Sequence, residues 1–125
     1  MSRVRARDTK PEMVVRRLVH RMGYRYRLHQ RHLPGVPDLV FSRRKKLIFV
    51  HGCFWHWHEH GSCRGPRMPK TRISYWREKL RRNVERDAQN IERLGADGWE
   101  VLVVWECELN DMNALETRLR NFLNS

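Results

Sequence analysis

The stretch Leu47–Val50, with the sequence Leu-Ile-Phe-Val, decides the fold of this 125-residue chain. A continuous apolar run of this kind is expected of a central strand that is buried on both faces of a sheet. A second buried-type strand is predicted at 99–105, and a long helix from about 73 to 96 lies between the two. Strand, helix and strand form a βαβ unit, so we expect parallel strands joined by a right-handed crossover.

Signals at the ends of the other segments complete a single α/β domain, 1–125, in which helices flank a mixed central sheet. Thr9 as N-cap, Pro11 in the first turn and Glu12 at the capping-box position predict a helix that ends at Gly23. The remaining predicted elements are strands at 24–28 and 38–42, a basic turn at 43–46 and a short helix at about 112–122. The predicted apolar stripes are Met13, Val14, Leu18 and Met22 in the first helix, and Trp76, Leu80, Val84, Asp87, Ile91 and Leu94 in the long one.

The composition indicates a polyanionic partner. Lys and Arg number 26 against 14 Asp and Glu, a formal net charge of +12, and nucleic acid is the default partner for so basic a small domain. No apolar run approaches a membrane span, and no apolar segment follows the basic N-terminus as in a secretory signal. Three cysteines cannot all pair within one chain, which favours a reducing cytosol and metal or thiol roles.

The segment from His51 to Cys63 carries four histidines and two of the three cysteines, which suits a zinc site. Cys53, His58 and Cys63 have the spacing Cys-x4-His-x4-Cys. Cys107 follows a strand that should lie parallel to the strand before Cys53, so it can supply the fourth ligand. Spacing alone does not decide which of His56, His58 and His60 is the ligand, and a buried cysteine beside a solvated His-rich loop is the alternative.

A second, catalytic metal site is predicted around Asp38, which opens a strand beside the strand that ends at His51. Hard oxygen ligands from Asp38 and a strand carbonyl suit Mg²⁺, and a histidine then remains to activate water. Asp87 occupies a position of the apolar stripe, where a charge is costly unless it is paired, so it could orient His51. Glu12 could add a second carboxylate, although capping explains it without chemistry.

Large aromatic residues lie in and near the His51–Cys63 segment. The helical stripe favours a core position for Trp76. Phe54 and Trp55 are harder to bury, because a metal-binding loop offers little core. For these two the sequence leaves open whether they are core residues or apolar wedges that enter a DNA base step.

At these residues the chain resembles the very short patch repair (Vsr) DNA mismatch endonucleases. The resemblance runs in collinear order over nearly the whole chain, and its most specific string is His-Gly-Cys-Phe-Trp-His at 51–56. The matching segments are 7–12, 33–38, 49–56, 75–79, 83–87 and 98–107.

The resemblance implies a restriction-endonuclease-like core, and a Mg²⁺-dependent nick 5′ to the thymine of a T·G mismatch left by deamination of 5-methylcytosine. Asp38 would bind Mg²⁺ with the Val50 carbonyl, and His56 would activate water. His51 and Asp87 would support the hydrated metal, with Glu12 at the edge of the site. The implied structural zinc ligands are Cys53, His58, Cys63 and Cys107, and the implied DNA contacts are Phe54, Trp55 and Trp76 as the wedge, with Lys79 and Asn83 nearby.

Two departures from the family pattern accompany the resemblance. The loop between His58 and Cys63 is longer than expected, which leaves His60 as an alternative to Cys63. The N-terminal arm is short or absent, which bears on affinity and mismatch selectivity.

We expect a monomer that acts on double-stranded DNA in the bacterial cytoplasm, associated with the nucleoid and with other mismatch-repair proteins. The alternatives are a zinc-stabilised DNA-binding module without hydrolysis, or a nickase without mismatch preference.

Overall fold

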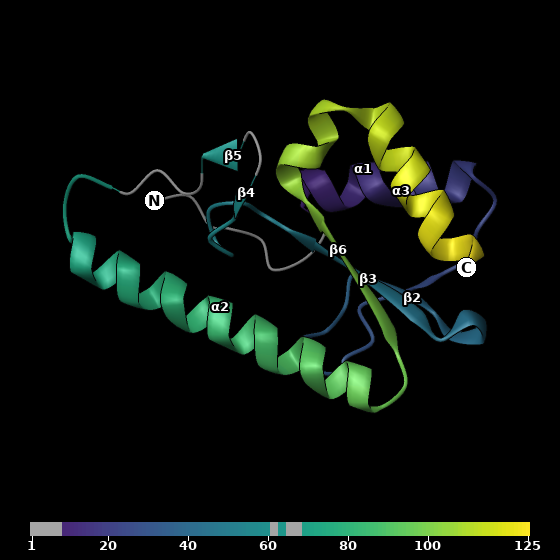
Figure 1. Cartoon of the computed structure of the whole chain (residues 1–125), viewed down its shortest axis with the longest axis horizontal. Coiled ribbons are helices and arrows are strands. Elements are labelled where there is room, and N and C mark those ends of the chain that lie inside the picture. The colour runs from purple at the N-terminus through teal and green to yellow at the C-terminus, as the bar shows by residue number, and fades with distance from the viewer. Residues whose placement is uncertain (1–8, 61–62, 65–68) are drawn as a thin grey trace.

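The computed structural model describes residues 9–60, 63–64 and 69–125, and within them a four-stranded sheet separates two groups of helices (Figure 1). The strand order is β1-β2-β3-β6, and a separate hairpin consists of β4 and β5. The strands are β1 (Arg27–Leu28), β2 (Leu39–Phe41), β3 (Lys46–His51), β4 (Glu59–His60), β5 (Cys63–Arg64) and β6 (Glu100–Trp105). The helices are α1 (Lys10–Arg21), α2 (Ile73–Ala96) and α3 (Met112–Asn124), with short 3₁₀ turns η1 (Ser42–Arg44) and η2 (Glu106–Asn110).

The central strand β3 pairs antiparallel with β2 and parallel with β6. The parallel register runs from Lys46 opposite Glu100 to His51 opposite Trp105. The predicted strand–helix–strand unit with parallel strands is therefore confirmed, as is the mixed sheet. Because the two strands end side by side, the residues that follow them emerge at the same edge of the sheet.

Alternating side chains of the strands pack into two apolar cores, one on each face of the sheet. The core on the α1 and α3 face contains Val15, Leu18, Val19, Leu39, Phe41, Ile48, Val104, Leu115, Leu119 and Leu123. The core on the α2 face contains Val40, Leu47, Phe49 and Leu94. This division explains why β2 and β3 read as continuous apolar runs, since both of their faces are covered.

Helix α1 begins as predicted, but its buried stripe differs from the predicted one. The Thr9 hydroxyl oxygen accepts a hydrogen bond from the Glu12 amide at 3.3 Å. The buried residues are Glu12, Val15, Leu18 and Val19, whereas Met13 and Val14 are half-buried. The prediction is confirmed for Leu18, and Met22 packs against the core, but it is wrong for Met13 and Val14. The buried face of the helix includes the charged residue Glu12, which has polar partners of its own.

The basic segment 43–46 is not simply a turn. Lys46 is the first residue of β3, and only 2% of its surface is exposed. Its Nζ donates to the main-chain oxygen of Phe122 and to the main-chain oxygen and hydroxyl of Ser125, the latter two at 2.7 and 2.6 Å. A lysine that satisfies the last carbonyls of a helix also complements the negative end of its dipole.

The limits of the remaining helices and strands are close to those predicted, except that two strands are shorter than predicted. The predicted strand at 24–28 forms only β1, and the one at 38–42 forms only β2, because residues 42–44 turn into η1. Helix α2 has the predicted limits, with Leu80 and Leu94 buried, but Val84 is 42% exposed and is not a core residue. In Figure 1 the first half of α2 extends beyond the four-stranded sheet, and Leu80 is buried there outside the two apolar cores.

Among the described residues, none of the helices combines the length and the apolar character needed to cross a lipid bilayer.

Replacing Lys46 by Met tests the anchoring of α3. The variant keeps the apolar stem but loses the charged donor, so we expect the free energy of unfolding to fall by about 1.5–3 kcal/mol. Urea unfolding followed by circular dichroism measures this change. Arg43→Met, at an exposed position of the same basic segment, should leave stability unchanged; an equal loss in both variants would contradict the anchoring role.

Candidate functional site

A tight turn before β2 brings Asp38 to the carboxyl ends of β3 and β6. Pro34 and Gly35 occupy the turn centre, Gly35 has a φ of +75°, and the Val36 amide donates to the Leu33 carbonyl at 3.1 Å. This is the pattern of a type II turn, which favours Pro followed by Gly. A Cβ at Gly35 would lie 3.0 Å from the Asn90 amide nitrogen, so the turn packs closely against α2.

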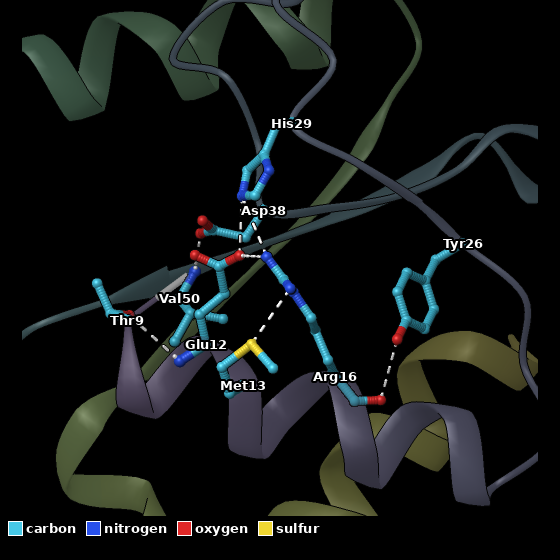
Figure 2. A network of polar contacts seen from close by, with 8 residues as sticks. All are labelled: Thr9, Glu12, Met13, Arg16, Tyr26, His29, Asp38 and Val50. Atoms are coloured by element: carbon cyan, nitrogen blue, oxygen red, sulfur yellow. Dashed lines mark hydrogen bonds and ion pairs between the residues drawn. The ribbon is translucent and has the colours of Figure 1, made fainter. Parts of the chain in front are cut away.

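A cavity of about 150 Å³ opens between this turn, the end of β3 and α2. Its lining includes Val50 and four residues predicted for the reaction centre, namely Asp38, His51, His56 and Asp87. Asn90 and Ile91 of α2 complete the wall beside Asp87. Glu12 lies next to Asp38 (Figure 2). The fold thus gathers side chains from three separate parts of the chain.

Asp38 is held by main-chain contacts with β3. Its Oδ2 accepts a hydrogen bond from the Val50 amide at 2.6 Å, and its own amide donates to the Ile48 carbonyl at 3.1 Å. Burial raises the pKa of Asp38 to about 7; the Val50 hydrogen bond opposes this rise, and the neighbouring Glu12 carboxylate adds to it. A bound cation would favour the ionised form, so the site is electrostatically prepared for one.

His51 and His56 form a parallel stack beside Asp87. Their ring centroids lie 3.7 Å apart with an angle of 4° between the planes, and His56 Nδ1 lies 2.5 Å from Asp87 Oδ2. Burial, and then the proximity of His56, lowers the pKa of His51 to about 4, while Asp87 acts in the opposite direction. His51 is therefore neutral near pH 7. The sequence predicted His51 as the imidazole that Asp87 orients, but in the structure the partner of Asp87 is His56.

Glu12 anchors a polar network behind Asp38, shown in Figure 2. The side chain of Glu12 is buried, and its Oε2 contacts the Arg16 guanidinium and, at 2.8 Å, His29 Nε2. Arg16 and His29 were not predicted from the sequence. The pair Glu12 and Arg16 has the i,i+4 spacing of helix ion pairs, a signal that was available. His29 carried no local signal, because it approaches only through the fold, with a left-handed φ of +46°.

A second cluster lies where the two parallel strands end. The potential ligand atoms of Cys53, His58, Cys63 and Cys107 are all within 4.8 Å of one another, and each cysteine is a free thiol. His58 Nδ1 lies 3.7 Å from Cys53 Sγ and 3.5 Å from Cys107 Sγ. Tetrahedral zinc with ordinary bond lengths would separate nitrogen and sulfur ligands by about 3.5 Å, so the donor set and its dimensions fit this metal.

The cysteine thiols of this cluster lie in surroundings that disfavour their ionised form. Burial is the main reason that the pKa of Cys53 is raised to about 12, and the pKa of Cys107 is also raised, again chiefly by burial. Thiols in such surroundings ionise when a metal binds. The side chain of His60, the alternative ligand, lies outside the described residues.

Three aromatic rings form a group of their own. Phe54 and Trp55 lie 5.0 Å apart between centroids, and each lies 5.9 Å from Trp76, all edge-to-face. Trp76 is half-buried and packs with these rings, so the core position that periodicity favoured is wrong. The Asn83 amide donates to the Trp55 carbonyl at 3.1 Å, and half-buried Lys79 lies one turn earlier on α2.

Comparisons with known proteins agree with this site. Residues 1–62 match the family model described as DNA mismatch endonuclease Vsr. The chain is 52% identical over 124 residues to the type II nicking enzyme V.XorIIP of Xanthomonas oryzae pv. oryzae, covering 99% of this chain and 89% of that one. It is 42% identical over 115 residues to the DNA mismatch endonuclease Vsr of Escherichia coli K12, covering 92% of this chain and 72% of that one.

Among solved structures, the catalytic domain of the homing endonuclease I-Bth0305I superposes with a TM-score of 0.63 at 20% identity, covering 92% of this chain and 94% of that domain. This likeness concerns the fold and confirms the predicted restriction-endonuclease-like core. The relatives, in contrast, share sequence over most of their length. The chain therefore belongs to the Vsr family of DNA mismatch endonucleases and is a DNA endonuclease.

Proposed function

We propose that the protein is a Mg²⁺-dependent endonuclease that nicks one DNA strand 5′ to the thymine of a T·G mismatch, the product of 5-methylcytosine deamination. The observation that carries this proposal is the convergence of Asp38, His51, His56 and Asp87 on one cavity beside Val50. The E. coli relative is named as a mismatch endonuclease, and the Xanthomonas relative as a nicking enzyme.

Asp38 and the Val50 carbonyl would hold Mg²⁺. Both offer hard oxygen ligands, and the cavity leaves room for the waters that Mg²⁺ retains. The raised pKa of Asp38 fits a carboxylate whose charge a cation would compensate. Bound Mg²⁺ would supply Lewis-acid stabilisation of the phosphodiester as charge develops on it.

His56 would be the base that activates water. Its Nδ1 is engaged by Asp87, which orients the ring and leaves Nε2 to accept a proton. His51, neutral and stacked on His56, would hold that ring in place and bind water at the metal. Glu12 would act from behind Asp38, where Arg16 offsets its negative charge and His29 contacts its carboxylate.

Structural zinc bound by Cys53, His58, Cys63 and Cys107 would hold the segment that carries His56. The donor set and distances support this assignment. Phe54, Trp55 and Trp76 would form the wedge that opens the base stack at the mismatch, with Lys79 and Asn83 beside it. Their half-buried position outside the two cores supports this role, because such rings remain available to a partner.

The setting we propose is the bacterial cytoplasm, where a monomer consisting of one domain works at the nucleoid with other mismatch-repair proteins. The formal charge of +12 supports contact with double-stranded DNA. A nickase without mismatch preference is the alternative function, and the name of the Xanthomonas relative gives it weight. A DNA-binding module without hydrolysis would need none of the four cavity residues.

A strand-nicking assay tests the proposal with two duplexes that differ only at one base pair, which is T·G in one and C·G in the other. We expect Mg²⁺-dependent nicking of the T·G duplex, none after Asp38→Asn, and a loss of about 10²–10⁴-fold after His56→Ala. His32→Ala, which removes an exposed histidine from the loop before β2, is the control and should nick normally. Equal cutting of both duplexes would establish the alternative, and nicking that survives Asp38→Asn would refute the assignment of Asp38.

Loss of one proposed zinc ligand should destabilise the fold. We expect Cys107→Ser to release zinc and to lower the free energy of unfolding by several kcal/mol, because metal binding in such a loop contributes directly to folding. Zinc content by mass spectrometry and thermal unfolding measure the two effects. With excess chelator the variant and the wild type should become equally stable. Full zinc content and an unchanged melting curve in the variant would exclude the four-ligand site.

Nicking at limiting Mg²⁺ should rise with pH until about pH 7. Because the pKa of Asp38 is raised to about 7, a proton competes with the metal below that pH, and the rate should fall about tenfold per unit. His51, with a pKa of about 4, stays neutral throughout. Higher Mg²⁺ should move the midpoint to lower pH. A midpoint that is independent of Mg²⁺ in rate–pH profiles would contradict this competition.

A further inference from the structure

Trp105 occupies a position between the cysteine cluster and the cavity that the proposed function does not use. It is the last residue of β6 and lies opposite His51, the last residue of β3, in the parallel register. Residues paired in a parallel ladder place their side chains on the same face of the sheet. Two residues beyond each lies a cysteine of the cluster, Cys53 after His51 and Cys107 after Trp105.

The rings of four residues form a continuous chain of contacts from the cluster to the cavity. His58 lies against the face of Trp105, with centroids 4.0 Å apart and an angle of 9°. Trp105 meets His51 edge-to-face at 5.2 Å. His51 in turn stacks on His56 at 3.7 Å. A side chain of the cysteine cluster is thereby connected to the proposed base through direct ring contacts.

Packing matters for His51 because hydrogen bonding does not hold its buried nitrogen. Its Nδ1 is buried and has no hydrogen-bond partner among the residues that the structure describes. The ring is confined instead by its neighbours, Phe49 at 5.5 Å, Trp105 and His56. His56 has the Asp87 carboxylate to hold one nitrogen, but the plane on which it stacks is that of His51. Removing the Trp105 ring would therefore free His51 to tilt.

We propose that Trp105 is a positioning residue through which zinc at the cysteine cluster aligns His51 and His56. Zinc fixes His58 and ties the ends of β3 and β6 together through Cys53 and Cys107. His58 then fixes the plane of Trp105, and Trp105 supports His51. The inference rests on the proposed zinc site and nuclease function, and it gives the zinc a role beyond holding a loop.

Three variants separate this role from simple stability. His58→Cys keeps four ligands, since zinc accepts four cysteines, but removes the ring that stacks on Trp105. Trp105→Leu keeps all four ligands and removes the supporting ring, whereas Trp105→Phe retains a ring. Trp99→Leu is the matched control, because Trp99 packs on the α2 side of the sheet near Lys45, away from the histidines.

The first readout is the set of imidazole NMR signals of His51 and His56 in DNA-free protein, with zinc content measured alongside. We expect His58→Cys and Trp105→Leu to bind one zinc and to shift both sets of signals, as withdrawal of zinc from the wild type also does. Trp105→Phe and Trp99→Leu should leave them near their wild-type positions. Unchanged signals in zinc-loaded Trp105→Leu, or in His58→Cys, would overturn the proposal.

The second readout is the nicking rate at saturating DNA. We expect a fall of about tenfold or more in Trp105→Leu, as for other residues that orient a site, with a smaller change in KM and recovery in Trp105→Phe. An equal fall in Trp99→Leu would mean a general loss of stability and would overturn the proposal. If the wild type nicks no duplex, the proposed function fails, while the NMR comparison still decides the role of Trp105. If Trp105→Leu does not fold, His58→Cys and zinc withdrawal decide it.

Discussion

The in-register parallel pairing of β3 and β6 is the constraint on which the rest of this structure depends. It ends both strands at one level, His51 opposite Trp105, so that the segments after them leave the sheet together. The cysteines two residues further on then meet, although more than fifty positions separate them in sequence. A shift of one residue in the pairing of β3 with β6 would turn His51 to the other face of the sheet. The residues of the cavity and of the cysteine cluster would then no longer lie together.

Buried charge is the second organising feature, and the fold compensates it locally. Asp38 and Glu12 are neighbouring carboxylates near the end of β3, an arrangement that is costly in a medium of low polarity. Arg16 and His29 face Glu12, and the Val50 amide faces Asp38. As a result the pKa of Asp38 lies near neutrality, and a bound cation would favour the ionised form of this carboxyl group.

Local patterns predicted the elements well, but not the residues that serve more than one of them. The apolar runs, the Thr9 cap and the limits of α2 follow from short-range rules, and the structure confirms them. Lys46 was assigned to a turn because its partners lie in α3, far along the chain. Val84 and Trp76 fit the same helical stripe as Leu80, yet only Leu80 is buried, while Val84 is 42% exposed and Trp76 is half-buried. Periodicity alone does not show which positions of a stripe meet other parts of the chain.

By itself the sequence determined the strand–helix–strand unit, the mixed sheet, and the group of residues whose chemistry marks this family, because these depend on apolar periodicity and on a motif that is continuous in the chain. The tertiary structure decided the partnerships: Asp87 with His56, Glu12 with Arg16 and His29, and Trp105 between His58 and His51. These contacts join residues from separate elements, and their geometry follows from strand register and from the packing of α1 and α2 on the sheet. No local pattern carries that information, since the distance between two side chains on different elements is set only when the sheet is assembled.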